Sequence, residues 1–320
     1  MTAQNLFPTE ATWYNNFPIT NLVDNSVTDF DLFLKLGDGI VLYASNGYHW
    51  IKEELSALIA NGYSDFLTLK TDTKKANMYL QIAQIPKVEK NLPPFERIKS
   101  LEQIGSQFIK ALYEGEITPA CVKKSEEIAR TLADCIDEDR TCIKAISGLA
   151  DHDYYTYYHS IRVATYALAI SVEMGLSDHR QMKEIVVGGI FHDIGKKEVG
   201  LEIINKTGSL TEDEWAQMKS HPEYGLASIN DANLSHIPQE IILHHHEKLD
   251  GSGYPHGIGS TSLLPEVQIA TLADVFDALT SSRTYQNKRS RYEALQFIKD
   301  KMVGPKLPYE AFSALISCLK

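Results

Sequence analysis

The amino-acid sequence predicts an α+β protein, in which a small N-terminal α/β module precedes a larger all-helical domain. Three observations support this class. Short β-prone runs occur only in the first third of the chain, a proline-rich stretch follows them, and apolar residues have helical spacing from Phe95 onward. With 320 residues, 43% hydrophobic and 23% charged, the chain is long enough for two domains and a sizeable core.

The N-terminal module is expected to combine a β-hairpin with helices. The run from Phe30 to Leu36 alternates apolar and polar residues, and Gly37-Asp38-Gly39 supplies a turn before the next β-prone run. A helical pattern further on stops at Asn61-Gly62, which favours a helix C-terminus. We therefore expect strands at 30–36, 40–44 and 65–70, and helices at 50–60 and 73–84.

A linker is expected where the composition changes. The stretch from Pro86 to Pro94 contains three prolines and several charges. We therefore divide the chain into an N-terminal regulatory module at 1–86, a linker with connecting helices at 87–148, and a helical domain at 149–320.

Two helix starts and one long loop can be recognised in the helical domain. The pairs Thr211 with Glu214 and Ser290 with Glu293 have the spacing of capping boxes. The irregular segment from Glu247 to Leu264 is rich in glycine. A loop of this length in a helical domain is more often functional than idle.

The overall charge excludes one class of function. The formal net charge is -11, whereas non-specific binding to a nucleic-acid polymer requires many Lys and Arg side chains. Metal ions or a few placed basic residues must therefore supply positive charge for any anionic substrate.

The cysteines and the N-terminus indicate a reducing compartment. No CxxC pair occurs, so we expect the four cysteines to be buried, reduced thiols. The N-terminus resembles no signal peptide, and no apolar run approaches the ~20 residues that span a bilayer. We expect a cytoplasmic protein without membrane contact.

Several imidazoles and carboxylates interrupt apolar helices, where burial without a partner would be costly. Any one of them alone is best explained as a satisfied core residue. The joint occurrence instead indicates a metal site, and mixed His/carboxylate ligation suits Mn, Fe, Zn, Ni or Co. The set comprises His159, His192, Asp193, His221, His245, His246 and Asp274.

The other histidines are expected to have different roles. His49, His179 and His236 stand among polar neighbours, which favours surface or capping positions. For His152 and His256, a ligand role is the less favoured interpretation.

The sequence resembles HD-GYP phosphodiesterases over roughly residues 120–320. His192-Asp193-Ile194-Gly195-Lys196 is similar to the HD signature, which many phosphohydrolases share. The segment from His245 to Pro255 resembles the much more specific HHExxDGxGYP motif. Further matches are Asp153-Tyr154-Tyr155-Thr156 before His159, Asn205-Lys206-Thr207-Gly208, Met218-Lys219-Ser220-His221-Pro222, and Asp274-Val275-Phe276-Asp277-Ala278-Leu279-Thr280. The N-terminal module matches no catalytic family.

The resemblance implies a helical HD-type catalytic domain with two divalent transition metals, iron or manganese. One metal would be held by His159, His192, Asp193 and Asp274, and the other by Asp193, His221, His245 and His246. Members with a third metal carry a Glu where this chain has Tyr155, so two metals are expected. His244 has no matching ligand role.

A hydroxide that bridges the two metals is the expected nucleophile. Lys196 is expected to stabilise phosphate charge or to orient the hydroxide, held in turn by Asp277. A lysine that complements the dipole at a helix C-terminus is the less favoured alternative. Arg283 resembles an arginine that contacts the substrate phosphate in the family, and a solvated arginine at a helix end is the alternative. The loop residues Gly253 and Tyr254 are expected to shape the mouth of the site, although a purely structural turn is an equal alternative. Glu247 and Asp250 are interpreted as groups that orient the ligands.

Two departures from the family pattern remove positive charge. Gln268 stands where an arginine is usual, and Gln286 stands where a lysine is usual. Either change could weaken affinity or shift the preference among cyclic dinucleotides.

The resemblance implies hydrolysis of cyclic di-GMP to pGpG and onward to GMP. A hydrolase of a related cyclic dinucleotide such as 3′,3′-cGAMP is an alternative. A catalytically weak or inactive module that binds cyclic dinucleotides is another. The implied partners are GGDEF-type signalling proteins at the GYP loop and a second copy of the chain in a homodimer.

Overall fold

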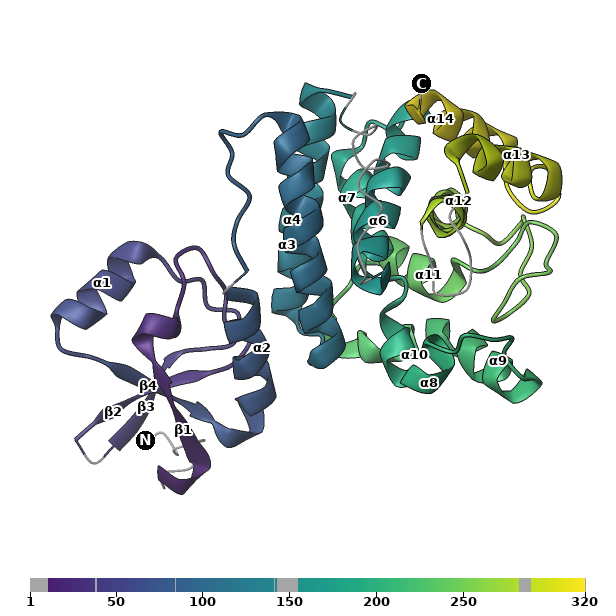
Figure 1. The fold of residues 1–320 in the computed structure, drawn as a ribbon. Coiled ribbons are helices and arrows are strands. Elements are labelled where there is room, and N and C mark those ends of the chain that lie inside the picture. The colour runs from purple at the N-terminus through teal and green to yellow at the C-terminus, as the bar shows by residue number, and fades with distance from the viewer. Residues whose placement is uncertain are drawn as a thin grey trace.

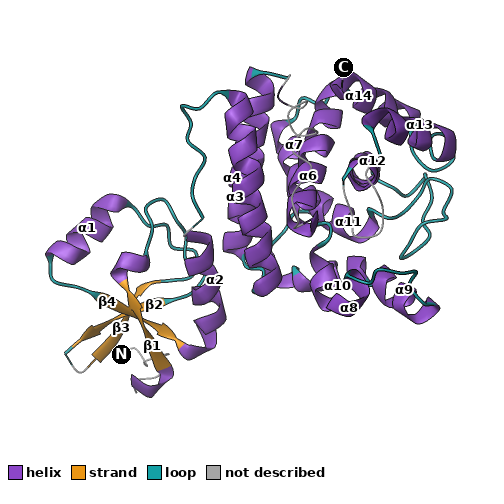
Figure 2. Cartoon of the chain, viewed as in Figure 1, coloured by secondary structure: helices purple, strands orange, loops and turns teal. Residues whose placement is uncertain are grey.

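The computed structural model describes residues 11–37, 39–83, 85–140, 142, 155–281 and 289–319. A small antiparallel sheet with two helices forms the N-terminal part, and helices form the rest (Figures 1 and 2). The predicted fold class is therefore confirmed.

The N-terminal sheet has the strand order β1-β4-β2-β3, and every described pairing is antiparallel. The predicted hairpin is present, and Gly37 takes the left-handed conformation (φ 61°) that a glycine allows in its turn. One strand was not predicted, because its sequence YNNFP lacks β-branched residues. The strands are β1 Tyr14–Pro18, β2 Leu32–Leu36, β3 Gly39–Ala44 and β4 Asp65–Leu69.

Helices α1 Lys52–Ala60 and α2 Thr73–Ala83 complete the N-terminal part, as expected. Buried aromatic side chains, including Trp50 and Phe66, form a core of their own there. Met78 of α2 instead belongs to the core of the helical part. The N-terminal part is thus packed against the helices and not merely tethered to them.

Helix α6 lies at the centre of the helical part and packs against α3, α7, α12 and α14 (Figure 1). Every residue from His159 to Ser171 is buried, as expected for a helix that is surrounded by other helices. The capping boxes at Thr211 and Ser290 are both observed. The first helices are α3 Pro94–Glu114, α4 Pro119–Glu138, α6 Tyr155–Glu173, α7 His179–Phe191 and α8 Leu201–Ile204. The later ones are α9 Glu212–Lys219, α10 His221–Ser228, α11 His236–His244, α12 Pro265–Thr280, α13 Arg291–Lys301 and α14 Tyr309–Leu319.

Five short 3-10 helices lie among the described elements. They are η1 Ala11–Trp13, η2 Ile19–Asn21, η3 Lys70–Asp72, η4 Ile194–Glu198 and η5 Asn230–Ala232.

All four cysteines are free and buried. Within the described ranges, none of the helices has both the length and the apolar character needed to cross a bilayer.

Helices α6 and α7 approach each other closely at one glycine. A Cβ added to Gly189 would lie 2.8 Å from the Cα of Ala164, so backbone would have to move to admit it. We predict that Gly189→Ala lowers the free energy of unfolding by about 1–3 kcal/mol, because overpacking separates the two helices. Urea denaturation measures this effect. The control Gly208→Ala, where no atom lies within 4 Å of the new Cβ, should change it by less than about 0.5 kcal/mol. Equal effects in the two variants would contradict the prediction.

Candidate metal centre

The seven expected ligands converge from five helices and the turns that follow them. His159 lies on α6, and Asp274 lies on α12. His192 and Asp193 follow the end of α7, His221 begins α10, and His245 and His246 follow the end of α11. The structure brings all seven together in two groups, each with its ligand atoms within 4.8 Å of one another. The groups are Asp193, His221, His245 and His246, and His159, His192 and Asp274.

The carboxylate of Asp193 lies between these two groups. Its Oδ1 is 3.3 Å from His221 Nε2 and 3.8 Å from His245 Nε2. Its Oδ2 is 3.3 Å from His192 Nε2 and 3.7 Å from His159 Nε2. One oxygen therefore faces each group, which is the arrangement that a carboxylate shared by two cations requires.

The hydrogen bonds of the histidines leave their Nε2 atoms available for metal. Nδ1 of His192 is 2.7 Å from Gly189 O, and Nδ1 of His221 is 2.8 Å from Met218 O. Nδ1 of His245 is 3.0 Å from Ile242 O. Because a carbonyl oxygen only accepts, each Nδ1 donates and the proton is absent from Nε2 in the neutral ring.

The buried Nε2 of His192 lies where either a proton or a metal cation would be stabilised. This atom has no hydrogen-bond partner among the described residues, yet it lies 3.3 Å from a carboxylate oxygen of Asp193. Two lone pairs facing each other in a buried site would repel without a proton or a cation between them. The set of imidazole and carboxylate donors suits a divalent transition metal.

The local electrostatics favour the metal-binding form of two imidazoles and of the shared carboxylate, whereas at His192 burial is outweighed by the charge of Asp193, which raises the pKa of that ring. Burial and the neighbouring imidazoles hold the pKa of His245 and of His246 well below the usual value, so both rings are neutral at neutral pH. Burial alone would raise the pKa of Asp193, but His192 and Lys196 together hold it well below the usual value. Asp193 is therefore a carboxylate anion at neutral pH.

A backbone contact explains the glycine of the HD-x-G-K segment. A Cβ on Gly195 would lie 1.9 Å from His221 O and 2.3 Å from Gly225 N. Any side chain there would push α10 away from η4. The absence of a side chain therefore lets His221 reach Asp193.

The expectation that Asp277 holds Lys196 is wrong. Asp277 Oδ2 is 2.7 Å from His159 Nδ1, and its Oδ1 accepts from Arg162 Nε at 2.6 Å. Lys196 Nζ instead lies 2.5 Å from Asp193 Oδ2. The reason is geometric, because Asp277 lies one turn from Asp274 on α12 and so faces α6. Asp277 orients a metal-ligating imidazole.

Two residues that support the site were not predicted. Arg162 is buried and donates to Asp277 and Glu102, and it lies one helical turn from His159. Arg162 is a single charged residue within an apolar helical run, and this pattern could have indicated its buried supporting role. The hydroxyl of Tyr113 donates to the backbone oxygen of Asp193 at 2.9 Å. Tyr113 lies 80 positions away in the sequence, so no local pattern indicated this contact.

The Gly-rich loop packs against the metal centre through Tyr254. Its ring stacks on His246 with 4.6 Å between centroids and an interplanar angle of 29°. A Cβ on Gly253 would lie 2.3 Å from Glu247 Cα, so this glycine lets the loop fold back on itself. The interpretation that Glu247 and Asp250 orient the ligands is wrong. Glu247 accepts from the backbone N–H groups of His256 and Gly257, and Asp250 accepts from Ser252.

A basic pocket of about 500 Å³ adjoins the centre at His246. Lysines from three segments of the chain line it, and the sequence did not predict that these segments meet. Burial and the nearby Lys306 lower the pKa of Lys248. The lysines are Lys219, Lys248, Lys301 and Lys306, and the aromatic walls are Trp215, Tyr254 and Phe297.

The remaining candidates lie elsewhere. His244 belongs to neither ligand group, and His49, His179 and His236 are exposed. The Nε2 of Gln268 donates to Leu263 O. His152, Arg283, Gln286 and the side chain of Tyr155 lie outside the described residues.

Comparison with known proteins identifies relatives of the helical part. A model of the HD domain family matches residues 144–304. A cyclic di-GMP phosphodiesterase of Pseudomonas aeruginosa is 35% identical over 149 residues, covering 46% of this chain and 36% of the relative. A 3′3′-cGAMP-specific phosphodiesterase of Vibrio cholerae is 31% identical over 162 residues, which cover 51% of this chain and 37% of the relative. A cyclic di-GMP phosphodiesterase of Thermotoga maritima is 33% identical over 198 residues, which cover 60% of this chain and 53% of the relative.

The matches span about a third to a half of the length of these curated relatives. One solved structure extends over both parts of the chain. It is Bd1817, described as an HDG"Y"P protein from Bdellovibrio bacteriovorus, with a TM-score of 0.63 and 20% identity. The alignment covers 96% of this chain and 99% of that one, so the two proteins share a fold.

Removing the carboxylate charge behind His159 tests the supporting hydrogen bonds. We predict that Asp277→Asn weakens divalent-metal binding by about 10- to 100-fold, because His159 loses the partner that orients its ring. Calorimetric titration of the metal-free protein with Mn²⁺ measures this change. The control Asp300→Asn alters an exposed carboxylate on α13 and should bind as the wild type does. Unchanged affinity in a folded Asp277→Asn protein would show that the bond is not needed.

Proposed function

The chain belongs to the HD domain family, and from this premise we propose that it is a metal-dependent phosphodiesterase acting on a cyclic dinucleotide. The position of Asp193 between two groups of imidazoles and carboxylates carries the proposal. An arrangement of this kind suits two cations that share one carboxylate. We expect iron or manganese, because nitrogen and oxygen ligands are mixed and no thiolate is present in either group.

The cations and the side chains would have different roles in hydrolysis. Two divalent cations, when bound, would activate a water and neutralise charge on the phosphoryl oxygens. Lys196 is partly exposed at the edge of the group, so its ammonium can donate to a phosphate oxygen. Asp277 is held by Arg162 and would keep the imidazole of His159 oriented toward the metal during the reaction.

The basic pocket supports an anionic, ring-bearing substrate. Its lysines supply the local positive charge that a chain of net charge -11 otherwise lacks. Its aromatic side chains offer surfaces for stacking a base. Because the pocket begins at His246, a dinucleotide can place one phosphate at the metals and its other half among the lysines. We propose cyclic di-GMP as substrate and pGpG as first product.

A related substrate is the second candidate. Some of the relatives are named as specific for 3′3′-cGAMP, and Gln268 supplies no positive charge. Measuring both cyclic dinucleotides with the same preparation decides between them.

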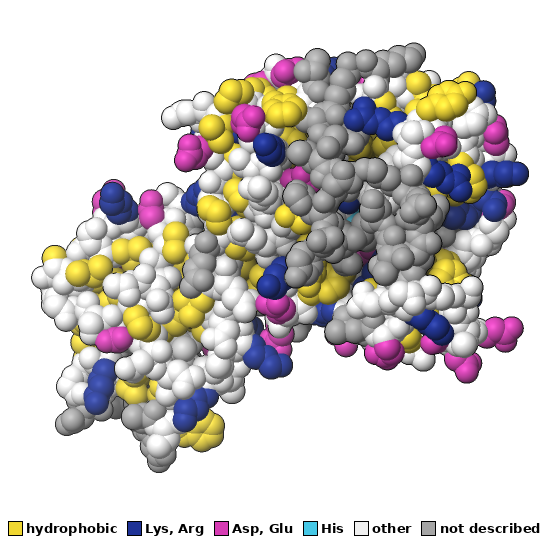
Figure 3. Space-filling model, in the orientation of Figure 1, with side chains coloured by type: hydrophobic (Ala, Val, Ile, Leu, Met, Phe, Trp, Pro, Cys, Tyr) yellow, Lys and Arg dark blue, Asp and Glu magenta, His cyan; other side chains and the backbone are white. Residues whose placement is uncertain are grey.

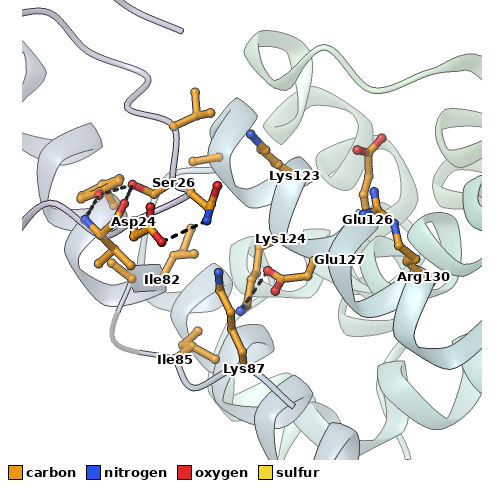
Figure 4. A pocket seen from close by; sticks show the side chains of 16 residues that line it. Asp24, Ser26, Ile82, Ile85, Lys87, Lys123, Lys124, Glu126, Glu127 and Arg130 are labelled. Carbon is orange, nitrogen blue, oxygen red and sulfur yellow. Dashed lines mark hydrogen bonds and ion pairs between the residues drawn. The ribbon is translucent and has the colours of Figure 1, made fainter. Parts of the chain in front are cut away.

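The N-terminal module is proposed to be regulatory. It encloses, together with α4, a pocket of about 290 Å³. Ser26 lies on one side of this pocket, and Lys123, Lys124 and Arg130 lie on the other (Figure 4). A conformational change in the module can therefore be transmitted to α4. Helix α4 packs against α7, and the end of α7 is followed by the ligands His192 and Asp193. GGDEF-type partners at the Gly-rich loop and a homodimer also remain proposals.

Removal of the shared carboxylate tests the activity. We predict that Asp193→Ala lowers the turnover of cyclic di-GMP by at least about a thousandfold, because neither metal group keeps its common ligand. The assay follows the substrate and pGpG by chromatography with protein loaded anaerobically with Fe²⁺ or with Mn²⁺. The exposed-carboxylate variant Asp300→Ala should retain wild-type turnover. Tight binding by the wild type without turnover in every metal would instead indicate a non-catalytic binding module.

The role of the lysines can be separated from catalysis. We predict that Lys301→Ala raises KM for the cyclic dinucleotide about tenfold and leaves kcat within about twofold, because a charge-assisted contact is worth roughly 1.5–3 kcal/mol. The control Lys299→Ala removes an exposed lysine of the same helix that does not line the pocket. If both variants raise KM equally, the effect comes from overall charge and not from the pocket.

A further inference from the structure

A third group of metal-ligating side chains lies at the base of the Gly-rich loop. It consists of His244, Glu247 and His256, whose ligand atoms lie within 4.8 Å of one another. None of the three belongs to the two groups around Asp193. His244 ends α11, whereas His256 lies within the loop, so the group joins the loop to the helix.

Two buried atoms of this group lack partners. Nδ1 of His244 and Oε2 of Glu247 make no hydrogen bond to any described residue. His244 is 7% exposed and Glu247 is 1% exposed, so bulk water does not satisfy these atoms. Unpaired buried polar atoms are rare and costly, and two in one cluster indicate that something binds between them.

The surrounding contacts hold these side chains in place for a ligand. Glu247 Oε1 accepts from His256 N at 2.7 Å and from Gly257 N at 2.9 Å, which leaves Oε2 as the available oxygen. A second carboxylate approaches the far side of each ring. Glu240 Oε2 is 3.8 Å from His244 Nε2, and Glu223 Oε1 is 4.0 Å from His256 Nε2.

At these distances the two carboxylates act through their charge and not through a hydrogen bond, and that charge favours a proton on the far nitrogen of each ring. Each ring is then left with Nδ1 as its ligand atom.

We propose that His244, Glu247 and His256 bind a further divalent transition-metal ion, with Zn²⁺ as the best match. Two imidazoles and one carboxylate form a common zinc ligand set, and nitrogen ligands disfavour Ca²⁺ and Mg²⁺. His256 is exposed, so the fourth position can be filled by water. The ion fastens the loop to α11, and the same loop places Tyr254 on His246.

Metal content measured at equilibrium tests the proposal. Metal-free, full-length protein is dialysed against buffered free Zn²⁺, and zinc per chain is measured by mass spectrometry. His256→Ala should carry one zinc fewer per chain than the wild type, and because His256 is exposed the substitution removes no packing from the core. The control His179→Ala removes another exposed histidine and should carry the wild-type amount.

A crystallographic measurement gives an independent readout. Anomalous difference density at the zinc edge should place an ion between His244, Glu247 and His256 in the wild type. That peak should vanish in His256→Ala, while the peaks around Asp193 remain. Equal zinc content in His256→Ala and the wild type, or no anomalous peak among the three side chains, would overturn the proposal.

Discussion

The burial of the Asp193 carboxylate is the constraint on which the helical part depends. An anion at the centre of a helical core requires cationic or hydrogen-bonding groups on every side. The ends of α7 and α11, the start of α10 and the N-terminal part of α6 supply these groups. Tyr113 fixes the backbone of Asp193 from α3, so a connecting helix outside the ligand set also holds the centre.

Much of this arrangement could be predicted from sequence. Polar residues that interrupt apolar helices marked the ligands, and caps and turn residues marked several helix ends. The same reasoning would have found Arg162, which stands in an apolar run like that of Asp274. Strand β1 was missed because its stability comes from pairing with β4, some fifty positions away, and not from its own residues.

Contacts between distant segments account for the errors. The partner of Asp277 depends on the rotation of α12 against α6, which local spacing does not fix. The basic pocket gathers lysines from α9, the loop and the region around α13, and each of them alone resembles an ordinary solvated lysine. His244, His245 and His246 are adjacent in sequence, yet α11 ends at the first of them, so the side chains point to different places.

The basic pocket has a consequence for how a substrate arrives. The chain as a whole repels anions, and this repulsion acts on a long polyanion along its entire length. A small dianion inside the pocket lies close to the lysines, within the Debye length of about 8 Å at physiological ionic strength. For the proposed substrate, the charges of the chain would therefore favour a compact phosphodiester over a long nucleic acid. Added salt would reduce this preference for small anions, because it weakens both the repulsion of long polyanions by the whole chain and the attraction of a small anion to the lysines.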